Sequence, residues 1–126
     1  MKLLMIIAMG GAMGALSRHL VNGYITNLIG GGFPWGILTV NIVGSILLGA
    51  VVEITGNASA IDSDLKTFLT VGVLGAFTTF STFSLDVVEF FEKGFWLMGL
   101  VYVFASLALA VGGLVAGMCV TRGLIT

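Results

Sequence analysis

Four long apolar stretches decide what this chain of 126 residues can fold into. They cover residues 3–21, 35–52, 67–91 and 95–121, and a helix needs about 20 apolar residues to cross a bilayer. Only 9% of the residues are charged, whereas soluble domains carry about 25%. In lipid, each span must satisfy its own backbone polar groups, which favours helices. The sequence therefore predicts an all-α integral membrane protein with four transmembrane helices.

Short connections join the spans at residues 22–34, 56–64 and 92–94. No linker or low-complexity segment divides the chain, so residues 1–126 are predicted to form a single four-helix membrane domain. The start, Lys2 followed by an apolar run and small residues, also fits a signal peptide. Because the apolar run continues past the candidate cleavage site, we interpret it as a retained span.

The basic residues give almost no preferred orientation. Four spans put both termini on one side of the membrane together with Lys2, Lys66 and Arg122, and leave Lys93 and Arg18 on the other. An excess of Lys and Arg normally marks the cytoplasmic side, so this near-balance orients the chain poorly. Either one or two charges decide the orientation, or the chain inserts both ways and two copies pair antiparallel. Recurrent glycines, which let membrane helices approach closely, also favour an oligomer.

The stretch GAFTTFSTFS at residues 75–84 is unusual for the middle of a membrane helix. Hydroxyl side chains in a helix can bond back to their own backbone, and phenylalanines three apart are often a packing stripe. The density of hydroxyls and the preceding glycines instead predict a third helix broken near its middle. Carbonyls freed between Gly75 and Thr79 would coordinate a cation. Phe80 and Phe83 would offer the positive edges of their rings to an anion.

Other polar residues within the spans have two interpretations each. Asn41 either forms a hydrogen bond between helices or donates to an anion in a pathway. Arg18 either extends to the membrane interface or draws anions to a pore mouth. Tyr102 and Ser106 share a helix face through their spacing of four, and donate either into a pathway or to a neighbouring helix. Asp86, towards the end of its span, faces either a polar vestibule or the headgroups.

Three motifs, GALSR at 14–18, WGILTVNIVGS at 35–45 and GAFTTFSTFS at 75–84, together resemble the Fluc family of bacterial fluoride channels. The resemblance covers nearly the whole chain. It implies a passive, fluoride-selective ion channel that exports fluoride from the cytoplasm and protects against its toxicity. It further implies an antiparallel dual-topology homodimer with two pores and a structural sodium ion at its centre. The implied location is the bacterial inner membrane, as a multi-pass protein whose partners are fluoride, sodium, lipid and a second copy, with no nucleic acid.

The same resemblance, carried over motif by motif, implies roles for individual residues. Backbone carbonyls of Gly75 and Thr78 would hold the sodium ion. Ala110 departs from the family pattern, because some members carry a serine there. The fluoride pathway would be formed by Asn41, Phe80, Phe83, Ser81, Thr82, Tyr102 and Arg18.

A small proton-coupled four-helix exporter is the main alternative. Proton coupling needs a carboxylate within the membrane, but the mid-span polar residue is Asn41, which does not titrate, and Asp86 lies near a span end. A non-transporting assembly subunit is a third class, for which hydroxyl-rich packing would suffice. An enzyme is not expected, because the chain has one His and shows no metal-ligand cluster or nucleophile–base pair.

Overall fold

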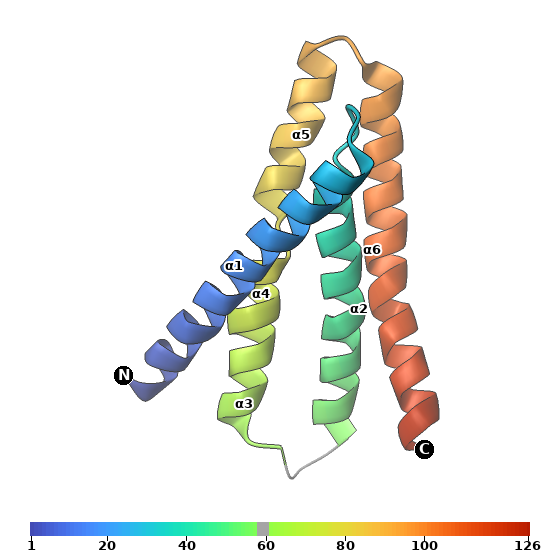
Figure 1. The fold of residues 1–126 in the computed structure, drawn as a ribbon. Coiled ribbons are helices and arrows are strands. Elements are labelled where there is room, and N and C mark those ends of the chain that lie inside the picture. The colour runs from blue at the N-terminus through green and yellow to red at the C-terminus, as the bar shows by residue number, and fades with distance from the viewer. Residues whose placement is uncertain (58–60) are drawn as a thin grey trace.

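The computed structural model describes residues 1–57 and 61–126, and within them the chain is helical apart from short connections. Both ends of the chain lie at the same end of the molecule, which we call the terminal end (Figure 1). Among the described residues, four helical segments are long and apolar enough to cross a membrane. The chain is therefore an all-helical, multi-pass membrane protein, with candidate spans at Lys2–Ile29, Trp35–Gly56, Ser63–Glu92 and Trp96–Ile125.

The first two helices extend beyond the expected spans. Helix α1 covers Lys2–Ile29 and helix α2 covers Trp35–Asn57. α1 stops at Gly30, whose φ of 68° is a conformation that glycine adopts at little cost. The expected connection at 56–64 is shortened at its start by α2, and its residues 58–60 lie outside the described part of the chain.

The third span is broken near its middle, which confirms the sequence prediction. It consists of α3 (Ser63–Thr67), η1 (Phe68–Leu74), α4 (Gly75–Phe77) and α5 (Phe80–Glu92). Thr78 and Thr79, between α4 and α5, have extended backbone conformations. The interruption lies after Gly75, which is itself helical. η1 is a π-helix, a rare form that is frequent at functional sites.

Helix α1 packs directly on the backbone of η1. A Cβ atom added to Gly10 would lie 2.8 Å from the carbonyl oxygen of Phe68. One added to Gly14 would overlap the carbonyl oxygen of Val73. Gly72 of η1 faces Gly10 in the same contact. Small residues permit this approach between membrane helices, so α1 fixes the position of the first half of the third span.

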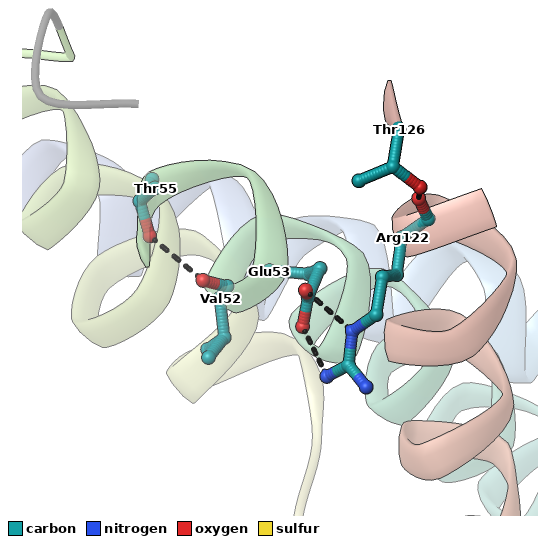
Figure 2. A network of polar contacts seen from close by, with 5 residues as sticks. All are labelled: Val52, Glu53, Thr55, Arg122 and Thr126. Atoms are coloured by element: carbon teal, nitrogen blue, oxygen red, sulfur yellow. Dashed lines mark hydrogen bonds and ion pairs between the residues drawn. The ribbon is translucent and has the colours of Figure 1, made fainter. Parts of the chain in front are cut away.

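Helices α2 and α6 (Trp96–Ile125) lie side by side along their lengths (Figure 1). Gly49 on α2 and Gly117 on α6 bring the two backbones together, because a Cβ at either position would overlap a carbonyl oxygen of the other helix. At the terminal end, Arg122 donates through Nε and Nη2 to the two carboxylate oxygens of Glu53, at 2.8 and 3.0 Å (Figure 2). These contacts make α2 and α6 one close pair.

The apolar core lies mainly in the half of the molecule away from the terminal end, between α2, α4, α5 and α6. Val40 of α2 and Tyr102 of α6 are fully buried there. Most other large apolar side chains are exposed on the helix surfaces, as expected where lipid rather than water surrounds the protein. The core consists of Ile37, Leu38, Val40, Phe77, Phe83, Phe90 and Tyr102.

Candidate functional site

The break in the third span is stabilised by a side chain from the second span. Asn41 donates through Nδ2 to the carbonyl of Thr79 at 3.1 Å, and its Oδ1 accepts from the N–H of Thr79 at 2.8 Å. The Oγ1 of Thr79 accepts from the N–H of Thr82 at 3.2 Å, which caps α5. Unsatisfied backbone groups are very unfavourable inside a membrane. Asn41 therefore allows the helix to remain interrupted at this depth.

Two carbonyls beside the break lose their usual helical donors. In a continuous helix, the N–H groups of Thr79 and Thr82 would donate to the carbonyls of Gly75 and Thr78. Here both N–H groups bond to side-chain oxygens. The carbonyl of Thr78 accepts a long hydrogen bond of 3.4 Å from Arg18 and has a second lone pair. Gly75 and Thr78 thus carry the kind of freed backbone oxygens that coordinate sodium in broken membrane helices.

A cavity of about 260 Å³ lies beside the break, and we call it the break cavity. The ring of Phe83 lies along it, with its centroid 5.5 Å from that of Phe80 and 5.1 Å from that of Tyr102. Phe83 is 8% exposed and Phe80 is 74% exposed. The cavity therefore combines two aromatic rings with a polar lining from three spans, which consists of Asn41, Ser45, Thr78, Thr79 and Ser106.

Ser106 has a feature that no other described residue shares. It is 6% exposed, and its Oγ is the one fully buried side-chain polar atom in the described part of the chain without a hydrogen-bond partner. Leaving a buried hydroxyl unsatisfied typically costs about 1–3 kcal/mol. Because Ser106 lines the break cavity, its hydroxyl is available to a ligand there.

A second cavity of about 410 Å³ lies at the end of the molecule away from the termini, and we call it the vestibule. Thr82, Asp86, Glu89 and Lys93 of α5 and its C-terminal cap contribute to its lining. The hydroxyl of Tyr102 donates to Oδ2 of Asp86 at 3.0 Å. Since Tyr102 also packs on Phe83, it links the wall of the vestibule to the wall of the break cavity.

The family model and the known proteins that match this chain agree with one another. Residues 5–118 match the family model described as CrcB-like protein, Camphor Resistance (CrcB). The chain is 44% identical over 119 residues to the fluoride-specific ion channel FluC of Agrobacterium fabrum, covering 94% of this chain and 95% of that one. It is 41% identical over 122 residues to the FluC of Rhodospirillum centenum, covering 97% of each. The chain belongs to the CrcB/FluC family of fluoride-specific ion channels. A member of this channel family is not an enzyme.

In this CrcB/FluC family member, the predicted site residues fall into three groups. Asn41, Phe80, Phe83 and Thr78 meet at the break cavity. Thr82 faces the vestibule, and Tyr102 lies between the two cavities. The remaining residues line neither cavity, but they contact the break: Arg18, Ser81 and Gly75.

Sequence reasoning missed two polar residues of the break cavity in this family member. Ser45 follows Asn41 at a spacing of four on the same helix, which places both on one face, and this spacing would have identified it. Thr79 gave no such signal, because its role comes from the extended backbone at the break and from its bonds to Asn41.

Proposed function

We propose that this chain lets fluoride leave the cytoplasm passively and so protects the cell against fluoride toxicity. It acts in the bacterial inner membrane as one four-helix domain per copy, paired as an antiparallel homodimer. The observation that carries the proposal is the break cavity, where two phenylalanine rings, a carboxamide and an unsatisfied hydroxyl from three spans converge beside the broken helix.

The break cavity provides the weak, directed contacts that fluoride needs in place of water. Asn41 uses one Nδ2 hydrogen on Thr79 and retains a second for an anion. Ser106 contributes a hydroxyl with no other partner. The rings of Phe80 and Phe83 are tilted by 46° to one another, and their edges carry partial positive charge. Individually weak contacts suit conduction, because a site must release the ion as well as admit it.

The other pathway residues act on either side of this cavity. Thr82 lines the vestibule, and the ring of Tyr102 packs on Phe83 of the break cavity, so these two residues would border the route from one cavity to the other. Arg18 attracts the anion towards the break while its guanidinium holds the carbonyl of Thr78. Ser81 is exposed, with its Oγ 3.3 Å from that of Thr79, and it contributes a hydroxyl to the outer side of the break.

A second copy would cover the exposed side of the break. Gly75, Phe80 and Ser81 are exposed although they flank an interruption at mid-membrane. Irregular backbone at that depth is tolerated where protein buries it or where it lines a water-filled cavity. In an antiparallel pair, the mid-span breaks of both copies lie at the same depth.

The freed carbonyls of Gly75 and Thr78 support a structural sodium ion between the two copies. Each copy would offer both oxygens, so an antiparallel pair would surround the ion with backbone carbonyls. Such oxygens, at unwound positions in membrane helices, coordinate sodium. The ion would neutralise the carbonyl dipoles at the dimer centre and would not be transported.

Ion efflux from liposomes tests the proposed transport. Purified protein should release trapped fluoride and retain chloride, and efflux should require valinomycin to balance charge with potassium. A proton-coupled exporter would instead respond to a pH gradient and would lose transport in the Asp86→Asn variant. Equal release of chloride, or no release of fluoride, would rule out a fluoride-selective channel.

Sodium replacement tests the dimer centre. Exchanging sodium for N-methylglucamine should lower the midpoint of thermal unfolding of the dimer, and returning sodium should restore it. Potassium, which is larger, should restore less. A midpoint that is the same in all three cations would remove the sodium ion from the proposal and leave the transport result unaffected.

A further inference from the structure

The two ends of the molecule present different chemistry to the membrane. Tyr24, Trp35 and Trp96 are exposed. Tyr24 lies near the C-terminal end of α1, and Trp35 and Trp96 begin α2 and α6; these helix ends lie away from the termini (Figure 1). Exposed Trp and Tyr are enriched at the headgroup level of membranes. The sequence has only one further Trp or Tyr, the buried Tyr102, so the terminal end has no such anchor. There, the ion pair of Glu53 and Arg122 closes the contact between α2 and α6.

The depth of this ion pair follows from helix geometry. At 1.5 Å per residue, Glu53 lies about 27 Å along α2 from Trp35. Arg122 lies about 39 Å along α6 from Trp96 by the same measure. The hydrocarbon layer of a bilayer is about 30 Å thick. The two lengths differ by about 12 Å, so Trp35 lies deeper in the membrane than Trp96. With Trp96 at one headgroup layer, the ion pair therefore lies at the opposite one.

The pair leaves one side of the arginine available. The side chain of Glu53 is 8% exposed, whereas that of Arg122 is 57% exposed. Arg122 donates to the carboxylate through Nε and Nη2, and a guanidinium has five N–H groups in one plane. The third nitrogen, Nη1, points away from the carboxylate (Figure 2), so its N–H groups remain for another partner. A guanidinium already oriented by a buried carboxylate loses less freedom when it binds a second oxyanion.

We propose that Arg122, oriented by Glu53, binds the phosphate of a phospholipid headgroup at the terminal end. The planar fork of a guanidinium matches phosphate oxygens in a bidentate arrangement. The ion pair is neutral overall, so recognition rests on hydrogen-bond geometry. A zwitterionic phospholipid therefore serves as well as an anionic one. This contact gives the terminal end the interfacial anchor that the aromatic residues provide at the other end.

Native mass spectrometry of the purified full-length protein tests the proposal. The probes are phosphatidylcholine, phosphatidylglycerol, diacylglycerol with the same acyl chains, and inorganic phosphate. The wild-type protein should retain both phospholipids to a similar extent and diacylglycerol poorly. Arg122→Lys, which keeps the charge but not the fork, should weaken phospholipid retention about tenfold, corresponding to one charge-assisted hydrogen bond. Lys66→Gln, which removes an exposed basic residue at the same end, should have no effect.

Several outcomes would overturn the proposal. Retention of diacylglycerol equal to that of phospholipid would show that acyl chains alone are bound. Displacement of phospholipid by equimolar inorganic phosphate would assign the site to free phosphate. Equal retention by the wild type and Arg122→Lys would exclude the guanidinium. The first two comparisons use the wild-type protein alone, so they hold even where the variant does not fold.

Discussion

The two halves of the broken third span are attached to the rest of the molecule in different ways. The first half, η1 and α4, lies backbone against backbone on α1 at Gly10 and Gly14. The second half, α5, is attached through side chains, since Phe83 packs on the ring of Tyr102 and Asp86 accepts a hydrogen bond from its hydroxyl. A contact between two backbones cannot be relieved by rotation of a side chain, whereas contacts made by rings and hydroxyls can.

This difference matches the proposed roles of the two halves. The first half ends in the freed carbonyls proposed for the sodium ion, where small displacements change the coordination of a cation. The second half carries the rings and hydroxyls of the proposed anion pathway, where contacts must be weak enough to release an ion. Asn41 connects the halves, because both of its hydrogen bonds are to Thr79 at the junction.

The largest expected effect comes from filling the backbone contact of the first half. Gly14→Ala places a methyl group on the carbonyl oxygen of Val73, which cannot rotate away. The loss of stability should exceed the usual overpacking range of about 1–3 kcal/mol and should abolish the folded peak in size-exclusion chromatography. Gly11→Ala is the matched control, because nothing lies within 4 Å of its added Cβ. Similar behaviour of both variants would show that α1 does not fix η1.

Asn41 variants test the junction. Asn41→Asp keeps an acceptor for the N–H of Thr79 but turns the donor towards the Thr79 carbonyl into a repelling oxygen, and it adds a negative charge to an anion pathway. Fluoride efflux should fall roughly tenfold or more, and further than in Asn41→Ala. Efflux is compared in liposomes at equal, verified dimer content. A higher rate in Asn41→Asp than in Asn41→Ala would contradict both roles of Asn41.

Phenylalanine variants separate packing from conduction in the second half. Phe83→Leu removes a buried ring contact worth about 0.5–1.5 kcal/mol, so it should lower the unfolding midpoint as well as fluoride efflux. Phe80→Leu removes an exposed ring, so it should lower efflux with less effect on the stability of the single chain. Wild-type efflux in both variants would mean that the rings only pack.

The smallest effect is expected at the hydroxyl that attaches α5 to α6. Tyr102→Phe deletes the hydrogen bond to Asp86 and keeps the ring against Phe83, so it should cost about 0.5–1.5 kcal/mol. Tyr102→Leu deletes the ring as well and should cost clearly more. The unfolding midpoints of both variants in detergent provide the measurement. If the two substitutions cost the same, the hydroxyl rather than the ring holds α5.

The number of helices and the existence of a break could be predicted from the sequence. The thickness of the bilayer sets the length of each span, and backbone groups without hydrogen bonds are very unfavourable in lipid. The exact position of the break could not. The sequence placed the freed carbonyls between Gly75 and Thr79, and within that range Gly75 is helical and the chain opens at Thr78 and Thr79. The deciding contacts come from Asn41 and Arg18, which lie 38 and 60 residues away in sequence.

In the candidate site too, spacing along the sequence predicted some features, and others depend on how the helices pack. Spacing placed Tyr102 and Ser106 on one helix face, and both lie near the rings of α5. Spacing within one helix cannot show that Thr82 faces the vestibule while Phe83 faces the break cavity, because this depends on how α5 leaves the break. The π-helix of η1, which packs on α1, was equally invisible in the sequence pattern.

The pairing of α2 with α6 also has a consequence for biosynthesis. Glu53 leaves the ribosome 69 residues before Arg122, and at about 5–20 residues per second this is an interval of roughly 3 to 14 s. The pair lies at a headgroup layer, so the Glu53 carboxylate can stay hydrated during this interval, and it becomes buried against α6 only when Arg122 arrives. The insertion of α6 is then the step that closes the contact between α2 and α6 at the terminal end.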